Sequence, residues 1–285
     1  MQPMIVLSSY SLAPAFDARK RGHVHCEMSA DLGLTTVEIA LDDNRLQFAE
    51  GEYLRWPDAE IIRQDENGCY ALEAGEIRKI QTFSEVTNRH VSLMPTRNAP
   101  TVLIAGFPMH RIKNTDPMRD TQTKIRAIAP MTGRVLDTNM GLGYTAILAA
   151  RTAQDVITIE LDPAVVEVAG QNPWSRELFT NPRIRRVVGD SFDEVAAMET
   201  ETFARIIHDP PTIQLAGELY SAEFYRELYR VCQRGGRLFH YIGDPKSGHG
   251  AKYTPGVIRR LEAAGFTHVT RRPEAFGVSA IKNQA

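Results

Sequence analysis

The sequence predicts an α/β fold in which a small, mostly antiparallel β domain precedes a mostly parallel sheet with helices on both faces. From about residue 118 to the end of the 285-residue chain, strand patterns alternate with helix patterns, and the strands are nearly continuous apolar runs. Residues 1–113 instead contain short segments in which apolar and polar residues alternate between Gly, Pro, Asn and Asp. We therefore expect two domains, residues 1–117 and 118–285, with the boundary in the segment 113–120.

The first half is expected to be built from short strands. A short helix is expected at 56–64, and residues 42–44 and 66–68 have the composition of hairpin turns. The expected strands are 35–42, 45–51, 68–75, 76–84, 90–96 and 100–106.

The second half is expected to repeat β-α units and to close with a hairpin formed by "THVTRR" and "FGVSAIKN". Pro163 suits the first position of a helix, and Gly265 suits a helix end. The expected strands are 133–140, 155–162, 184–190, 203–209 and 236–243. The expected helices are 121–130, 143–153, a helix from Pro163, 221–233 and 254–265.

The composition describes a soluble globular protein. Hydrophobic residues make up 43% of the chain and charged residues 24%, and the formal charge of −2 gives no global field that favours nucleic acid. No apolar run reaches the roughly 18 residues that cross a bilayer, and the first residues lack the basic region of a signal peptide. We expect a cytoplasmic protein without a membrane partner.

The cysteines and histidines give no pattern for a disulfide framework or a metal site. Cys26, Cys69 and Cys232 are far apart and form no C-x-x-C pair, so each is expected to be a small core residue. His23 and His25 alternate on one expected strand without a third ligand. No metal is therefore expected.

A glycine turn lies between a strand and a helix in "VLDTNMGLGYTA" (135–146). Residues 141–146 fit the pattern G-x-G-x-x-A, which also suits a dinucleotide site and, by itself, a plain tight turn. Asp137 ends the strand just before the glycines. Because a carboxylate there repels a pyrophosphate and suits a cation, the position favours a cationic ligand.

Two further carboxylates end the next two strands. Glu160 stands where a carboxylate accepts ribose hydroxyls, and Asp190 could accept from an adenine amino group. All of these strand ends meet at the carboxyl edge of the sheet, where open α/β folds bind ligands. A ligand that needs an adenosine site and nearby negative charge, and that has no phosphate, is S-adenosylmethionine, whose sulfonium is positive.

With these motifs the sequence resembles the class I S-adenosylmethionine-dependent methyltransferases, whose sheet is Rossmann-like. The resemblance covers about 118–285 and is carried by "VLDTNMGLG", "TIELDP", "VVGDSF" and "HDPP". Asn139 replaces the first glycine of the family's D-x-G-x-G-x-G motif, and asparagine tolerates a left-handed backbone. The resemblance implies that Asp137, the turn and its two glycines contact the methionine portion, Glu160 the ribose and Asp190 the adenine. The cofactor residues implied within these motifs are Asp137, Asn139, Gly141, Gly143, Glu160, Leu161, Asp190, Ser191 and Phe192.

A closer resemblance covers nearly the whole chain. The segments "FSEVTNRHVSLMPT" (83–96), "FPMHRIKNTDPMRDT" (107–121) and "HDPPTIQLAGELYSAEFYRELYR" (208–230) are similar to an archaeal and bacterial branch of predicted methyltransferases that is related to spermidine synthases. This resemblance implies no particular substrate.

Asp209, Pro210 and Pro211 follow the expected strand 203–209 and resemble the (D/N)-P-P-(Y/F/W) loop of amino-directed methyltransferases. Proline cannot donate to a strand ladder, so the pair makes a stiff stop. Asp209 is the expected catalytic acceptor or base, with the Pro210 carbonyl beside it, and the stiffness aligns the acceptor nitrogen in advance. Thr212 stands where the motif has an aromatic residue, so a flipped nucleic-acid base is a less suitable acceptor.

Other candidates for the acceptor site lie near the same edge. Glu218 and Tyr220 follow a glycine and are expected to form a lid or a wall of the acceptor site. Either His240 or Tyr241, at the end of the fifth strand, could line the pocket, and His110 could bind an anionic group of the acceptor or lie in a solvated hinge.

These observations predict an enzyme that methylates a nitrogen of a small molecule, an amino acid or a peptide, using S-adenosylmethionine. The alternative is an aminopropyl transfer of the spermidine-synthase type, which uses decarboxylated S-adenosylmethionine. In the leading hypothesis, the β domain covers the acceptor or forms the contact of a homodimer. A third hypothesis is an RNA- or protein-binding module with a vestigial cofactor fold and no turnover.

Overall fold

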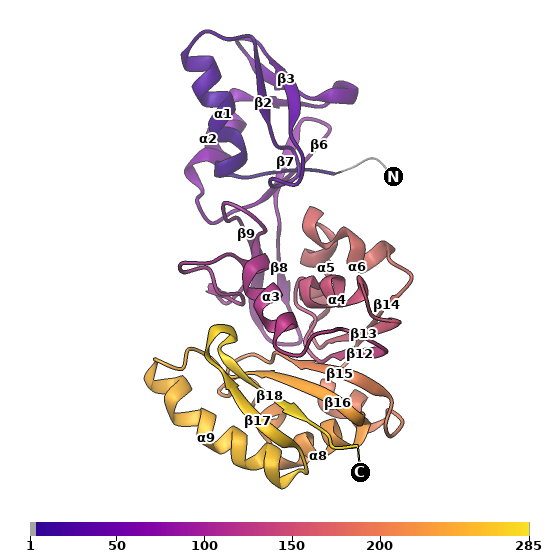
Figure 1. Ribbon diagram of the computed structural model, residues 1–285. Coiled ribbons are helices and arrows are strands. Elements are labelled where there is room, and N and C mark those ends of the chain that lie inside the picture. Colours follow the sequence, from indigo (N-terminus) through magenta and orange to yellow (C-terminus); the bar gives the residue numbers. More distant parts are fainter. Residues whose placement is uncertain (1–3, 285) are drawn as a thin grey trace. The chain divides into compact units, whose positions relative to one another are not determined.

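The computed structural model describes residues 4–284, apart from the side chains of Glu50 and His249 (Figure 1). These residues group into two compact units. One unit extends from the first described residue to Met118 and includes Ala164–Arg176, and the other comprises Arg119–Pro163 and the residues from Glu177 onward. Within the described part of the chain, no helix has both the length and the apolar character needed to cross a membrane.

The first unit contains three small antiparallel sheets, as the alternating patterns predict. Their strand orders are β1-β6-β7, β2-β3-β4-β5 and β11-β10-β9-β8. The strands are β1 (Ile5–Leu7), β2 (His25–Met28), β3 (Val37–Leu41), β4 (Arg45–Gln47), β5 (Tyr53–Arg55), β6 (Tyr70–Glu73), β7 (Glu76–Lys79), β8 (Gln81–Ser84), β9 (Arg89–Met94), β10 (Thr101–Ile104) and β11 (Phe107–Pro108).

Two helices pack on the core of this unit, and the sequence predicts only one of them. The expected helix 56–64 is α2 (Trp56–Gln64). Helix α1 (Ser9–Lys20) was not expected, because its interior Pro14 argues against a helix. The helix is nevertheless capped at its start, where the side chains of Ser8 and Ser11 bond to each other's backbone N–H. Its apolar residues are buried in the core shared with α2: Leu12, Ala15 and Ala18.

Several details of the first unit differ from the expectations. The turn 42–44 does join β3 to β4, and the Asp42 carboxylate accepts the Asn44 and Arg45 N–H groups. The turn 66–68 instead joins α2 to β6, so the hairpin expected there is wrong. The single strand expected at 76–84 divides into β7 and β8, and the strand expected at 45–51 ends at Gln47, before a 3-10 turn at Ala49–Gly51.

The second unit contains a seven-stranded sheet in the order β14-β13-β12-β15-β16-β18-β17. The first five strands in that order are parallel, and β18 and β17 are antiparallel, so the expected closing hairpin is confirmed. The strands are β12 (Arg134–Asp137), β13 (Asp155–Glu160), β14 (Ile184–Val188), β15 (Phe203–His208), β16 (Cys232–Tyr241), β17 (Thr267–Arg272) and β18 (Gly277–Ile281). The predicted α/β, Rossmann-like fold class is therefore confirmed.

The helices between these strands follow the expected alternation, with two additions. Helices α6 and α7 are too short to show a helical period in the sequence, and α9 begins six residues before the expected start at 254 despite its interior Pro255. The helices are α3 (Pro117–Arg126), α4 (Tyr144–Ala150), α5 (Pro163–Gly170), α6 (Arg176–Thr180), α7 (Ser191–Ala196), α8 (Ala222–Val231) and α9 (Gly248–Ala263), with 3-10 turns at Pro173–Ser175, Gly217–Tyr220 and Pro273–Ala275.

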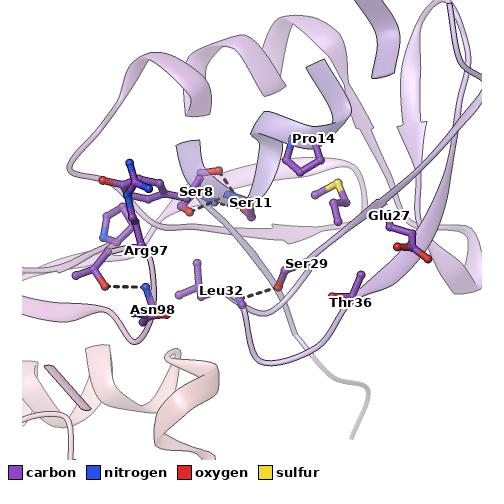
Figure 2. Close-up of a pocket in the computed structure, with 14 residues that line it drawn as sticks. Ser8, Ser11, Pro14, Glu27, Ser29, Leu32, Thr36, Arg97 and Asn98 are labelled. Atoms are coloured by element: carbon purple, nitrogen blue, oxygen red, sulfur yellow. Dashed lines mark hydrogen bonds between the residues drawn. The ribbon is translucent and has the colours of Figure 1, made fainter. Parts of the chain in front are cut away.

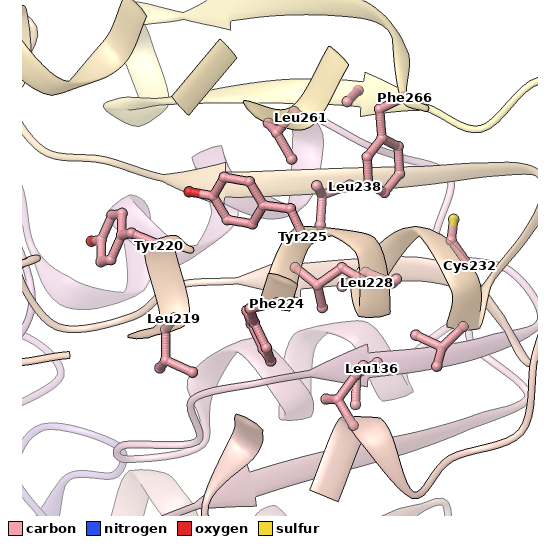
Figure 3. Close-up of a cluster of buried hydrophobic side chains, with 14 of the residues drawn as sticks. Leu136, Leu219, Tyr220, Phe224, Tyr225, Leu228, Cys232, Leu238, Leu261 and Phe266 are labelled. Carbon is pink, nitrogen blue, oxygen red and sulfur yellow. The ribbon is translucent and has the colours of Figure 1, made fainter. Parts of the chain in front are cut away.

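The core of the second unit lies against α8 and α9 (Figure 3). Helix α8 begins at its cap Ser221, whose hydroxyl accepts the Phe224 N–H at 3.0 Å. One side of the helix buries Phe224, Tyr225 and Leu228, together with Val231. Complete burial of side chains of this size stabilises the fold by roughly 1.5–3 kcal/mol each.

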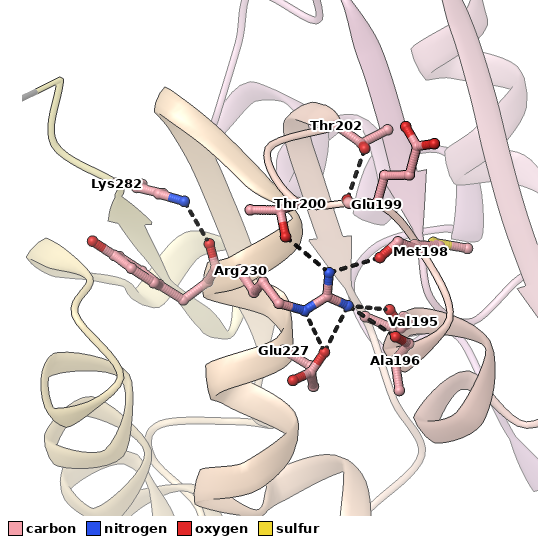
Figure 4. Close-up of polar contacts among 10 residues, drawn as sticks. Val195, Ala196, Met198, Glu199, Thr200, Thr202, Glu227, Arg230 and Lys282 are labelled. Atoms are coloured by element: carbon pink, nitrogen blue, oxygen red, sulfur yellow. Dashed lines mark hydrogen bonds and ion pairs between the residues drawn. The ribbon is translucent and has the colours of Figure 1, made fainter.

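One arginine near the end of α8 also holds α7 in place (Figure 4). The Arg230 guanidinium donates to the carbonyls of Val195, Ala196 and Met198 at 2.7–3.0 Å. Carbonyls at a helix end have no partner within the helix. The Arg230 guanidinium supplies hydrogen bonds to carbonyls at the end of α7. It thereby fixes the helix whose other end carries Asp190.

Candidate functional site

Four carboxylates follow the parallel strands at one edge of the sheet. Asp137 and Glu160 are the last residues of β12 and β13, Asp190 comes two residues after β14, and Asp209 directly follows β15. Because these strands are parallel neighbours, their carboxyl ends lie at the same edge. The edge that the sequence predicts is therefore present in the second unit.

Asp137 is completely buried and only partly satisfied. The Thr158 hydroxyl donates to Asp137 Oδ2 at 2.8 Å, whereas Oδ1 is buried and has no partner of ordinary hydrogen-bond geometry among the described residues. The Asn139 backbone N–H also acts on this carboxyl and lowers its pKa. Burial raises the pKa of Asp137 to about 8. A buried oxygen in this state suits a donor or a cation brought by a ligand.

The two glycines of the turn differ in the space beside them. Gly141 and Gly143 have φ values of +53° and +76°, which favour glycine. A Cβ on Gly143 would lie 2.5 Å from the Leu178 side chain, whereas a Cβ on Gly141 would meet nothing within 4 Å. The space beside Gly141 can therefore admit a ligand. Asn139 does not use the left-handed backbone, and its Oδ1 accepts from the Thr138 hydroxyl instead.

The Glu160 carboxylate is hydrogen-bonded to the glycine turn. Its Oε2 accepts the Gly141 N–H at 2.9 Å, and its Oε1 accepts the Asp162 N–H at 3.1 Å. Burial raises the pKa of Glu160 to about 7. A carboxylate has about four acceptor positions, so Glu160 can still accept from hydroxyl groups. The neighbouring Leu161 is exposed.

Asp190 caps α7 and places the residues that follow it. Its Oδ1 accepts the Phe192 N–H at 2.8 Å. The Ser191 hydroxyl donates to the Thr138 carbonyl next to the glycine turn, and Phe192 stacks on Phe224 with a centroid distance of 5.9 Å. The contact of Asp190 with an adenine stays a prediction.

A buried ion cluster lies beside Asp209. The Lys124 Nζ is 2.6 Å from Asp209 Oδ2 and 3.0 Å from Asp120 Oδ2, and it lies 4.6 Å from the centroid of the Tyr241 ring. Lys124 and Asp120 are buried, whereas 19% of the Asp209 side chain is exposed. Burial raises the pKa of Asp209, although Lys124 opposes this effect.

Lys124 and Asp120 are not among the site residues predicted from the sequence. Both stand on α3, and their spacing of four residues places them on one side of a helix. That spacing is the only signal in the sequence, because exposed helices carry the same pairs. Burial, which gives this pair its importance, is decided by the tertiary structure.

The histidines next to this cluster belong to a separate group of rings. His208 and His240 are adjacent in the β15–β16 ladder, with ring centroids 4.3 Å apart, and neither side chain is exposed. His208 Nε2 is 2.9 Å from the Leu219 carbonyl, and His240 Nε2 is 2.8 Å from the Tyr225 hydroxyl. The structure thus brings Tyr241, rather than His240, to the ion cluster.

The remaining candidates lie in different surroundings. Pro210 is buried, Glu218 is exposed, and the Tyr220 hydroxyl donates to the Pro211 carbonyl at 2.9 Å. Tyr220 also packs against the histidine rings. His110 belongs to the first unit, where its Nδ1 is 2.9 Å from the Thr101 hydroxyl.

A cavity of about 250 Å³ in the first unit contains none of the predicted residues (Figure 2). It lies beside the start of α1, and its lining includes Ser8, Ser11 and Ser29. These three hydroxyls already take part in hydrogen bonds within the protein. The carboxyl edge of the second unit therefore remains the candidate site.

The sheet order and the acidic carboxyl edge define a Rossmann-like domain with a candidate ligand site at that edge. Residues 89–247 match the family model of the spermine/spermidine synthase domain, which is more than half of the chain. The chain belongs to this family.

Relatives and solved structures agree with this assignment. The chain is 43% identical over 242 residues to the uncharacterized protein MJ1233 of Methanocaldococcus jannaschii, which covers 82% of each chain. It is 30% identical over 138 residues to a polyamine aminopropyltransferase of Mycobacterium tuberculosis, covering 46% of this chain and 26% of that protein. It also resembles the structure of spermidine synthase from Thermotoga maritima, with 17% identity, a TM-score of 0.56, and coverage of 75% of this chain and 77% of that one, which shows the shared fold.

These comparisons confirm the predicted relation to spermidine synthases and change the order of the two predicted activities. A plain methyltransferase was the first interpretation of the sequence, and aminopropyl transfer was the alternative. Because the family and the polyamine aminopropyltransferase match favour the alternative, the methyl transfer interpretation becomes secondary.

Proposed function

We propose that the protein transfers an aminopropyl group from decarboxylated S-adenosylmethionine to the nitrogen of an amine. The match of residues 89–247 to the spermine/spermidine synthase domain carries this proposal. The similarity to the mycobacterial polyamine aminopropyltransferase supports it, although the chain spans only about a quarter of that protein's length.

The charges at the edge support the decarboxylated form of the cofactor. Among the site residues described above, Asp137, Glu160, Asp190 and Asp209 are acidic, and a bound cation would lower the raised pKa values of Asp137 and Glu160 and so favour their charged forms. The cation Lys124 is already bonded to two carboxylates. A cofactor without a carboxylate carries only positive groups, its sulfonium and its ammonium. It therefore avoids the repulsion that a methionine carboxylate would meet there.

The residues present fit such a nucleoside. The unpartnered Asp137 Oδ1 can receive its ammonium group, and the open side of Gly141 can admit it closely. Glu160 would accept the ribose hydroxyls, and Asp190 with Phe192 would contact the adenine. When bound, the sulfonium supplies an electrophilic carbon for transfer.

Asp209 would hold and deprotonate the acceptor. Its partly exposed carboxylate accepts an N–H of the amine and directs the nitrogen lone pair toward the electrophilic carbon. The new N–C bond forms as the C–S bond breaks, the sulfur keeps the electron pair of that bond, and 5′-methylthioadenosine leaves. Asp209 accepts the proton released by the nitrogen and passes it to solvent. Its raised pKa makes it a better proton acceptor.

Product analysis tests the proposal. The purified protein would be incubated with amines and with either decarboxylated or complete S-adenosylmethionine, and the products identified by mass spectrometry. We expect 5′-methylthioadenosine and an amine that has gained an aminopropyl group. Formation of S-adenosylhomocysteine and a methylated amine, with no aminopropyl product, would contradict the proposal.

Methyl transfer to nitrogen is the second candidate, and one observation favours it. Asp209, Pro210 and Pro211 follow β15 as in the loop of amino-directed methyltransferases. The same residues would orient the amine in either reaction, so the products of the experiment above distinguish the two candidates.

A further inference from the structure

Thr158 is a buried hydroxyl inside an otherwise apolar strand. Between the charged ends of β13, the residues Val156, Ile157 and Ile159 are apolar and buried, and Thr158 is completely buried among them. A buried hydroxyl destabilises a fold unless it makes a hydrogen bond. The Thr158 hydroxyl can therefore contribute only through its partner.

That partner is Asp137. The two residues are neighbours in the parallel ladder of β12 and β13, and the Thr158 hydroxyl donates to Asp137 Oδ2 at 2.8 Å. Side chains branched at Cβ have a restricted χ1 angle, so the donor is held in one place. The hydrogen bond fixes one carboxylate oxygen. The other, Oδ1, has no partner of ordinary hydrogen-bond geometry among the described residues and is left for a donor of a ligand.

The hydroxyl also favours the charged form of Asp137. Burial raises the pKa of Asp137 to about 8, and the charges of Asp209 and Glu160 act in the same direction. The Thr158 hydroxyl acts against them and lowers the pKa, as does the Asn139 backbone N–H. An ammonium binds a carboxylate more strongly than a protonated carboxyl group, so a donor that favours the charge also favours a cationic ligand.

We propose that Thr158 is a positioning residue for the cofactor: its hydroxyl holds the Asp137 carboxylate charged and in place for the ammonium group of decarboxylated S-adenosylmethionine. This inference rests on the proposed function, because it takes Asp137 as the group that receives that ammonium. The effect of Thr158 therefore depends on the ligand. The neutral nucleoside 5′-methylthioadenosine has no ammonium, so its binding should not depend on the hydroxyl.

The test compares the two nucleosides by calorimetry at pH 7.5, in the wild-type protein and in Thr158→Val, which keeps the shape of the side chain and removes the donor. We expect the wild type to bind decarboxylated S-adenosylmethionine at least about tenfold more tightly than 5′-methylthioadenosine. Thr158→Val should weaken binding of the cationic nucleoside by about tenfold, the effect of one lost hydrogen bond to a charged group, and change binding of the neutral one by less than about twofold. Thr158→Ser, which keeps a hydroxyl, should retain the wild-type ratio.

An unchanged ratio of the two affinities in Thr158→Val would overturn the inference, because a purely structural defect weakens both ligands alike. The same shift in Thr158→Ser would overturn it as well, since that variant keeps the donor. Thr158→Cys, whose thiol is a weak donor, replaces Thr158→Val where that variant does not fold, and it should shift the ratio in the same direction.

The wild-type ratio needs no variant. If the wild type binds the two nucleosides equally well, Asp137 does not receive the ammonium and the inference fails. Methylated products in the product analysis above would contradict the proposed function, whereas the ratio of the two affinities would still report on Thr158.

Discussion

Where β15 and β16 end, one face of the sheet carries charged side chains and the other face carries neutral aromatic rings. On one face, Asp209 pairs with the buried cation Lys124. On the other face, His208 and His240 are stacked in a buried group of rings that includes Tyr225. His208 and Asp209 are neighbours in the chain, yet one joins the neutral face and the other the charged face.

Strand geometry and the cost of burying charge together explain this difference. Side chains alternate between the two faces of a sheet, so consecutive residues enter different surroundings. A buried charge needs an opposite charge, and Lys124 provides one for Asp209. In the described part of the chain no opposite charge contacts His208, so burial keeps it neutral and lowers its pKa to about 3. The charged face is therefore the candidate for chemistry, and the ring face for stability.

The largest expected effect is on turnover, which should fall when the charged face is altered and not when the ring face is altered. Asp209→Asn should lower turnover by about 100-fold or more, because a positioned base contributes 10²–10⁴-fold. His208→Gln should retain most of its turnover. The check is the rate of 5′-methylthioadenosine release at saturating substrates, with circular dichroism to confirm folding. Equal losses of turnover in the two variants would contradict the assignment of chemistry to one face.

The next effect concerns stability on the charged face. Lys124→Met should lower the free energy of unfolding at pH 7 by about 3–5 kcal/mol, because it leaves the largely buried Asp209 carboxylate without the cation that pairs with it. The deficit should shrink on acidification, since protonation removes the carboxylate charge. Urea unfolding measures both effects.

Lys282→Met is the matched control for Lys124→Met. Lys282 is also buried, but two of its partners are the carbonyls of Tyr229 and Cys232, and its carboxylate partner Glu201 is 40% exposed. We expect the free energy of unfolding to fall less in Lys282→Met, because removing Lys282 leaves no buried carboxylate without a cation. An equal loss in both variants would show that charge pairing is not what distinguishes the cluster at Asp209.

On the ring face, acid should act through both His208 and His240, because burial lowers the pKa of each, and His208 is the residue replaced here. Its pKa in the folded state, about 3, is below the ordinary value of 6.5, so the unfolded chain binds the proton more readily. This residue therefore contributes stability above pH 6.5 that is lost as the pH falls toward 3, by about 1.4 kcal/mol per pH unit. His208→Phe should remove that contribution, and urea unfolding at pH 6.5 and 4.5 measures it. The same acid sensitivity in the variant would indicate another group.

The smallest effect separates the cofactor carboxylates from the acceptor carboxylate. Glu160→Ala should weaken binding of 5′-methylthioadenosine by about 1–3 kcal/mol, the cost of lost hydrogen bonds to a charged group. The exposed Glu218 provides a control whose replacement by alanine should leave that affinity unchanged. Calorimetry measures both, and unchanged affinity in Glu160→Ala would mean that the ribose binds elsewhere.

Much of the fold could be predicted because local patterns determine it. The apolar runs at 155–162 and 203–209 predicted β13 and β15, and the closing hairpin followed from its two segments. Helix α1 was missed because Pro14 opposes a helix locally, whereas capping by Ser8 and burial of Leu12 in the core support it. The missed helix shows that capping and packing can outweigh one unfavourable residue.

The sequence by itself determined which carboxylates reach the edge of the sheet, because Asp137, Glu160 and Asp209 each end or follow a strand whose apolar run is visible in the chain. Only the tertiary structure decided what surrounds them. Lys124 is far from Asp209 in the chain, and a helix must be buried against that edge before its lysine becomes a partner. Burial gives this pair its importance, because a charge that is removed from water is stable only beside an opposite charge. No local sequence pattern shows that these residues become buried.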